Sequence, residues 1–371
     1  MDLSPEDSLR LNVLLANQPQ AIRINESSMT VFGLSEQGEA RVDLNPTCRD
    51  EQYIKRVKEL ISGHVLGSPG GYPVYLQRWT RMGQMKDDSL EQLLMLGESE
   101  AIVAAVCAPG LTDELARRAW WAMEDAENAR QMLRKKAVRE GAMGPVLAAY
   151  LVEHLPFESE PEKQIETIRL VLQDGLLDDK QVHDLWRKAG RKPPYFVGFL
   201  ASLPDAIPEA QEHHELYDRH AAKLQELAVA GNVVAASLSR ILSSQGQAWL
   251  HTLHKILRKP SNQDVINITF DEMAAYFSPL REEAVDATLE ELGEEAKAWV
   301  SGPAAAEILA IDESFASPLL AVRILSGFSY GVVRPVFKGT TAMGSLMRKK
   351  LAPVMEQMAP YLEVLTQHPP R

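Results

Sequence analysis

The stretch AIVAAVCAPGLTDELARRAW, residues 101–120, decides the architecture, because its pattern returns as TIRLVLQDGLLDDKQVHDLW over residues 167–186. In each stretch an apolar run leads through a turn into an amphipathic run that ends in tryptophan, Trp120 or Trp186. Thr112 and Asp178 follow the turns and are good helix N-caps. The pattern predicts two helical hairpins of the kind that stack in repeat proteins. Because any two amphipathic hairpins share part of it, an irregular stack stays open as an alternative.

Short helices joined by proline- and glycine-containing turns surround these hairpins from residue 86 to 205. We predict a helical-hairpin array there, similar to an α-solenoid. A proline-containing joint at 203–210 leads into a C-terminal helical domain, 206–371, with longer helices over 209–229, 232–258 and 283–299. The segment VINIT, 265–269, is expected to be extended, with Thr269 capping the helix that follows. Cys107 is expected to be a small core residue.

The first 85 residues predict a small α+β domain. Alternating apolar residues indicate strands over 20–26, 29–34 and 39–45, with SEQG at 35–38 as a hairpin turn. Helices are expected over 5–15 and 49–66. The whole chain is therefore predicted to be mainly α, with this α+β sub-domain, the hairpin array and the C-terminal helical region in order.

Composition limits the function classes. The 371 residues carry a net charge of −12, which disfavours phosphate backbones and anionic lipid as partners. The two cysteines form no CxxC pair, and no cofactor is expected. The N-terminus lacks the features of a signal peptide, and no apolar run approaches the ~18 residues of a membrane span. We expect a cytoplasmic protein without a membrane partner.

The stretch GSPGGYPVYLQRWTRMGQ, residues 67–84, invites a functional interpretation. It matches neither a Walker A loop nor GxGxxG, so we interpret it as a turn into a strand over 72–82. The aromatic and arginine side chains of that strand are candidates for contact with a partner, since such residues are enriched in interfaces. They are Tyr72, Tyr75, Arg78, Trp79 and Arg81.

Basic clusters form a second set of candidates. Arg134 and Lys135 lie in RQMLRKKAVR, and Arg187 and Arg191 lie in WRKAGRKPPYF. If the two clusters met on one face, they would form an anion or RNA groove. The competing interpretation, which we favour, is that the cations complement helix C-termini.

Histidines form a third set. Five of the nine are close in the sequence, and facing antiparallel helices could present several of them to zinc, iron or haem. No HExxH motif is present, and the neighbouring residues are typical of a solvated helix face. The five are His213, His214, His220, His251 and His254.

The chain contains no GxSxG, kinase or Cys/His catalytic signature. Over residues 48–84, CRDEQYIKRVKELISGHVLGSPGGYPVYLQRWTRMGQ, and 108–123, APGLTDELARRAWWAM, it resembles the DsrS family of sulfur-oxidation proteins, encoded with reverse-acting dissimilatory sulfite reductase. The resemblance implies a cytoplasmic protein without a recognised prosthetic group or established enzymatic activity.

We therefore expect a non-enzymatic accessory or regulatory protein of dissimilatory sulfur oxidation that binds a protein or an RNA. A histidine-ligated metal or haem redox protein is the alternative, and an enzyme whose site is assembled from unrelated positions is a third. The sequence leaves the identity of the partner and the oligomeric state open.

Overall fold

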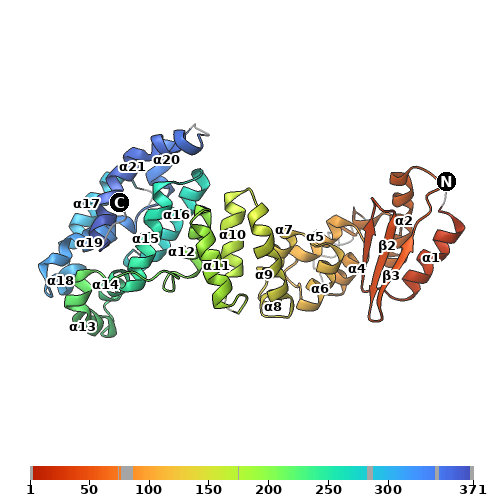
Figure 1. Ribbon diagram of the computed structural model, residues 1–371, viewed down its shortest axis with the longest axis horizontal. Helices are drawn as coiled ribbons and strands as arrows, with labels where there is room; N and C mark the ends of the chain where they lie inside the picture. The colour runs from red at the N-terminus through yellow and green to blue at the C-terminus, as the bar shows by residue number, and fades with distance from the viewer. Residues whose placement is uncertain are drawn as a thin grey trace. The chain divides into compact units, whose positions relative to one another are not determined.

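The computed structural model describes residues 3–73, 75–76, 87–173, 175–281, 287–338 and 342–367. Contacts divide the chain into two compact units, Met1–Pro156 and Phe157–Arg371. The described residues are mainly helical, with a small sheet near the N-terminus, which confirms the predicted fold class (Figure 1).

The N-terminal unit begins with a helix and a three-stranded antiparallel sheet. The helix α1 is Pro5–Ala16, and the strands are β1 Ala21–Asn25, β2 Thr30–Ser35 and β3 Gly38–Asp43, ordered β1-β2-β3. Ser35 pairs with Gly38, so the predicted SEQG turn sets the register of the second hairpin. The helix α2, Asp50–Leu66, follows and ends at Gly67, whose φ of 70° suits a left-handed helix cap.

One face of this sheet is buried against α1 and α2. Ile22, Val31 and Val42 lie on that face and belong to the same core cluster as Leu11 and Val57 from the two helices. The alternate strand residues must therefore lie on the opposite face. Burial of one face specifies which side chains the sheet presents on the other.

From Asp87 onward the N-terminal unit consists of short helices. The helices α4 and α6 contact β1, and helices two apart in the chain pack together, α5 on α7 and α7 on α9. The sheet and these helices thus share one compact unit, whereas the sequence analysis placed a boundary near residue 85. The bounds are α4 Asp87–Leu94, α5 Ser99–Cys107, α6 Asp113–Ala122, α7 Ala126–Leu133, α8 Lys136–Arg139 and α9 Met143–His154, followed by the 3₁₀ turn η1 Leu155–Phe157.

The second unit consists of helices. Among them α10 packs on α12, α12 on α15, α17 on α19 and α19 on α21. The bounds are α10 Pro161–Val171, α11 Asp179–Ala189, α12 Pro193–Ser202, α13 Glu215–Val229, α14 Val233–Leu242, α15 Ser244–Arg258, α16 Gln263–Phe277, α17 Leu289–Val300, α18 Pro303–Leu309, α19 Ala316–Leu325, α20 Tyr330–Phe337 and α21 Gly344–Leu365, with the 3₁₀ turns η2 Ser278–Leu280 and η3 Glu313–Phe315.

The two sequence-related hairpins become α5–α6 and α10–α11, one in each unit. Both predicted caps are present: the side chain of Thr112 accepts a hydrogen bond at the start of α6, and that of Asp178 does so at the start of α11. Trp120 packs edge-on against Tyr150, and Trp186 edge-on against two phenylalanines of α12. The shared pattern therefore encodes the same local role for tryptophan in each hairpin.

Three local predictions are wrong. The segment VINIT lies inside α16, because Asn262 caps that helix and Val265 and Ile266 are fully buried on it, which overrides their strand propensity. Thr269 is consequently a mid-helix residue whose Oγ1 donates to the carbonyl of Val265 at 2.6 Å. Cys107 is exposed, since it ends α5 on the side away from the core.

The described helices were also compared with the length and composition of a membrane span. None of them meets that requirement alone, and one bent pair, Glu313–Leu325 with Tyr330–Phe337, meets it jointly with a bend of 61°.

Candidate functional site

Four side chains form a cluster on the sheet face that points away from α1 and α2. Arg23 of β1 lies opposite Phe32 of β2, which lies opposite Arg41 of β3. The guanidinium carbon of Arg23 is 4.6 Å from the centre of the Phe32 ring and 4.8 Å from that of Trp121, and Arg41 is 5.9 Å from Phe32. We call Arg23, Phe32, Arg41 and Trp121 the arginine–aromatic face. Its spacing is that of cation–π contacts.

Helix α6 supplies the fourth member of this face. The indole Nε1 of Trp121 donates to Glu39 Oε2 at 2.9 Å, and Arg23 Nη1 donates to the Trp121 carbonyl at 3.3 Å. Because α6 packs on β1, these bonds hold the tryptophan over part of the sheet. The guanidinium of Arg23 is thereby fixed between two aromatic rings.

Each arginine of the face also has a carboxylate neighbour. Arg41 donates from Nε and Nη2 to Asp43 Oδ1 at 2.9 and 2.6 Å, and Arg23 Nη2 lies 3.4 Å from Glu39 Oε2. Their side chains are 62% and 37% exposed, so both stay accessible. The face is therefore polar and aromatic but close to neutral, unlike a groove built for phosphate groups.

A second charge cluster lies nearby on α6. Hydrogen bonds from Arg117 and, to a lesser degree, Arg118 lower the pKa of Glu114 to about 2. Arg117 also donates to Gln20 Oε1, in the turn before β1, at 3.3 Å. These contacts fix α6 to the start of the sheet and so help to position Trp121.

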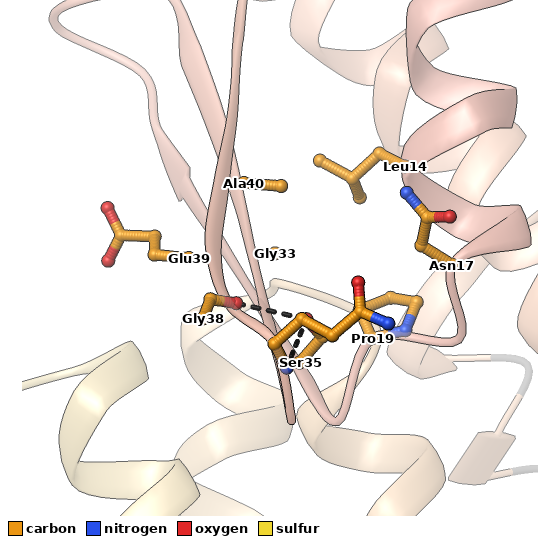
Figure 2. A pocket seen from close by; sticks show the side chains of 9 residues that line it. Leu14, Asn17, Pro19, Gly33, Ser35, Gly38, Glu39 and Ala40 are labelled. Atoms are coloured by element: carbon orange, nitrogen blue, oxygen red, sulfur yellow. Dashed lines mark hydrogen bonds between the residues drawn. The ribbon is translucent and has the colours of Figure 1, made fainter.

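A small cavity opens between α1 and the β2–β3 hairpin, on the side of the sheet opposite the arginine–aromatic face (Figure 2). It exists because Gly33 and Ala40, which pair across the strands, offer little side-chain volume opposite Leu14. Ser35 Oγ donates to the Gly38 carbonyl at 3.0 Å and closes its lower end. The volume, about 140 Å³, is below the roughly 300 Å³ at which ligand pockets begin.

A larger cavity of about 370 Å³ lies in the second unit, between the end of α10, α11 and residues 203–208. Aliphatic side chains such as Val171, Leu172 and Leu203 line most of it. Asp179 and His183, one helical turn apart on α11, supply polar groups. Gln173 adds a third polar side chain, so the lining combines aliphatic and polar groups.

The predicted strand at residues 72–82 is wrong where it can be seen, because residues 71–73, 75 and 76 are helical. Tyr75 is buried, and the Tyr72 backbone N–H donates to Glu98 at 3.0 Å, so this segment packs against the start of α5. The three other candidates here, Arg78, Trp79 and Arg81, lie outside the described residues.

The basic candidates lie at helix ends. Arg134 caps the C-terminus of α7, and Lys135 Nζ donates to the carbonyl of Cys107, the last residue of α5, at 3.1 Å. Arg187 is in the last turn of α11 and pairs with Asp184, and Arg191 is exposed just beyond it. These positions agree with cations that complement helix C-termini. The two clusters belong to different units.

Three of the candidate histidines have partners at the start of α13 or across it. His213 Nδ1 lies 2.8 Å from Asp218 Oδ1. His214 caps α13 with its ring, and burial lowers its pKa. His220 Nε2 lies 3.0 Å from Asp312 Oδ2, which connects α13 to the turn before α19.

The other two histidines are on α15. His254 Nε2 lies 3.3 Å from the hydroxyl of Thr366, and burial, with a smaller contribution from His251, lowers its pKa to about 4. Across the described ranges, no three or more His, Cys, Asp or Glu side chains gather so that they could hold a metal ion. The described contacts of these histidines are structural, and the metal site gains no support from them.

Comparisons with family models, curated proteins and solved structures give no match for this chain. The sequence analysis missed the arginine–aromatic face, although the signal was present. Once the three strands and the SEQG turn are placed, Arg23, Phe32 and Arg41 must share a row on one face. Only the approach of Trp121, which depends on how α6 packs, had no signal in the strands.

Proposed function

We propose that this chain is a non-enzymatic, cytoplasmic accessory or regulatory protein of dissimilatory sulfur oxidation that acts by binding another protein. The process comes from the resemblance to the DsrS family. The mode of action is supported by the arginine–aromatic face, which offers arginine, tryptophan and phenylalanine side chains on a rigid sheet. Tryptophan and arginine are the residues that contribute most to protein interfaces.

A protein partner is favoured over RNA because of the charge around this face. Glu39 and Asp43 lie beside the two arginines and would repel phosphate groups. A partner protein can offer its own carboxylates or backbone carbonyls to the two arginines in place of Glu39 and Asp43, so that the arginines stay paired in the complex. The planar rings and guanidinium groups provide large contact area with few rotatable bonds.

The test is capture of partners from sulfur-grown cells with the full chain as bait. The Phe32→Ala, Arg41→Ala double variant should recover a partner protein of the sulfur-oxidation pathway at least tenfold less well than the unchanged chain, since each contact of this kind contributes about 1–2 kcal/mol. The Leu9→Ala, Arg10→Ala variant is the control, because it likewise removes one large apolar side chain and one arginine, here from the exposed face of α1.

Phe32 is half-buried, so Arg41→Glu serves as a second variant that leaves the ring in place. Circular dichroism checks that each variant is folded. Recovery of RNA in place of protein would overturn the choice of partner. Capture of no pathway protein, or equal capture by the variants and the control, would overturn the proposal.

A further inference from the structure

Charge is distributed unevenly along the second unit. Residues 314–355 contain six lysines and arginines and no aspartate or glutamate, although the chain as a whole carries −12. The remaining residues therefore carry −18. At an ionic strength of about 0.1 M, salt screens exposed charges beyond a Debye length of about 10 Å. The attraction between a ligand and a surface formed by this run therefore depends on the local charge and not on the net charge of the chain.

Helix α20 presents one exposed stripe from this run. Tyr330, Arg334 and Lys338 follow each other at intervals of four residues and are all exposed, and the tyrosine is 47% exposed. The helix is buried through Val332, Val333 and Phe337. It is thus attached to the core by these side chains and exposes cations and an aromatic ring beside them.

The first half of α21 repeats this arrangement. Leu346, Lys349 and Lys350 are exposed and lie three and four residues apart, on one side of the helix. Met347 and Leu351 are buried on the other side. Met343, at the N-cap of this helix, is 68% exposed and Leu346 is 56% exposed, so two large apolar side chains accompany the lysines.

The two helices contact each other, so their exposed stripes lie on neighbouring elements (Figure 1). Arg348 Nη1 donates to the carbonyl of Pro260 at 3.3 Å and fixes the start of α21 to the segment before α16. We call the exposed set the basic–apolar patch; it consists of Tyr330, Arg334, Lys338, Met343, Leu346, Lys349 and Lys350.

We propose that the basic–apolar patch docks on the surface of an anionic phospholipid bilayer. Lysines on an amphipathic helix attract anionic headgroups, and exposed Leu, Met and Tyr side chains can enter the boundary between headgroups and acyl chains. Protein interfaces, in contrast, are depleted in lysine. Nucleic acid would gain little from Met343 and Leu346, which cannot stack on bases.

Co-sedimentation of the full chain with vesicles tests this docking. We expect binding to vesicles of phosphatidylcholine mixed with phosphatidylglycerol and much weaker binding to phosphatidylcholine alone. Replacing Lys349 and Lys350 by glutamate should weaken the partition by more than about 25-fold, since loss of each lysine near such a surface costs about 1 kcal/mol, or roughly fivefold, and each new carboxylate is repelled as well. Leu346→Ser should weaken it further at every salt concentration, because its contribution is not electrostatic.

The matched control is Lys180→Glu, Lys188→Glu, which reverses two exposed lysines on α11 in the same unit. It should bind the mixed vesicles as the unchanged chain does. Lys349→Gln, Lys350→Gln is a milder variant for use if the reversal disturbs folding. Equal binding to both vesicle types, equal loss in the control, or no binding would each overturn the proposal. So would loss of binding to an RNA oligomer in the patch variant without any effect on vesicles.

Discussion

Replacing Tyr53 by phenylalanine should destabilise the N-terminal unit through a single buried carboxylate. Asp7, in the first turn of α1, is fully buried and accepts from the Tyr53 hydroxyl and from the Asn45 backbone N–H. Tyr53 lies on α2, and its hydroxyl also lies 3.3 Å from Ser4 Oγ, the cap of α1. The network therefore joins α1, α2 and the segment after β3.

The magnitude follows from what the variant leaves behind. Phenylalanine keeps the ring, which is 1% exposed in the native residue, so no cavity forms. Asp7 loses its hydroxyl donor, and its Oδ1 atom already has no hydrogen-bond partner among the described residues. A hydrogen bond to a charged group contributes about 1.5–3 kcal/mol, so we expect the free energy of unfolding to fall by about 2 kcal/mol.

The pH dependence of the stability lost in Tyr53→Phe tests the role of Asp7 independently. Burial alone would raise the pKa of Asp7, but the hydrogen bonds from Tyr53, Asn45 and Ser4 outweigh it and hold the pKa below its usual value. The stability that ionised Asp7 contributes is present above its pKa in the unfolded chain, about 3.9. It is lost as the pH falls through the lower pKa of Asp7 in the folded chain. Without the hydroxyl the folded pKa rises. The difference in free energy of unfolding between the variant and the unchanged chain should therefore be greatest at neutral pH and decrease below about pH 4.

Urea denaturation followed by circular dichroism measures this difference in free energy of unfolding. Hydrogen exchange of α1 and α2 shows whether the destabilisation lies in these helices. The matched control is Tyr330→Phe, which removes an exposed hydroxyl and should change stability by less than about 0.5 kcal/mol. A loss below 0.5 kcal/mol in Tyr53→Phe, or a loss that is the same at pH 3 and pH 7, would refute the role given to Asp7.

Three further predictions concern the second unit. Arg240→Ala should lower its stability by about 1–2 kcal/mol in thermal denaturation, because the guanidinium lies 4.1 Å from the Tyr276 ring centre and pairs with Asp205; an unchanged melting temperature would contradict this. Thr288→Ala removes the capping box of α17 and should cost about 1 kcal/mol, with faster hydrogen exchange confined to the first turn of that helix. Acidification from about pH 6.5 to about 4 should destabilise the fold through His254. Its pKa in the folded state is lowered to about 4, so the unfolded state takes up the proton first. The His254→Gln variant should make the free energy of unfolding less dependent on pH over that interval.

Much of the N-terminal sheet can be predicted from the alternation of apolar and polar residues. Alternation placed the strands near β1, β2 and β3, and the two-residue turn in SEQG fixed which residues of β2 and β3 pair. Burial then decides the rest: once Val31 and Val42 face the core, Phe32 and Arg41 must face outward. The pair Phe32 and Arg41 was thus predictable, while the position of Arg23 depends on the turn between β1 and β2, and that of Trp121 on a helix far along the chain.

Segments with conflicting signals were assigned wrongly for an identifiable reason. VINIT has β-branched residues that favour strands, but Asn262 caps a helix there and the helix buries Val265 and Ile266. The segment after Gly67 reads as an alternating strand, yet residues 71–73 and 75–76 are helical and bury Tyr75. In both cases tertiary burial outweighs a propensity that spans about 1 kcal/mol.

The two proposed surfaces attract their partners in different ways, and raising the salt concentration should distinguish them. In the arginine–aromatic face, Arg23 and Arg41 lie beside carboxylates, so its attraction for a partner rests on shape and aromatic contact. In the basic–apolar patch, residues 314–355 supply cations and no carboxylate, so its attraction rests largely on charge. Screening weakens exposed charges strongly once the Debye length falls towards 3 Å, at about 1 M salt. Raising the salt concentration should therefore release the chain from anionic vesicles while its protein partner stays bound, and release of both at the same salt concentration would contradict this difference between the surfaces.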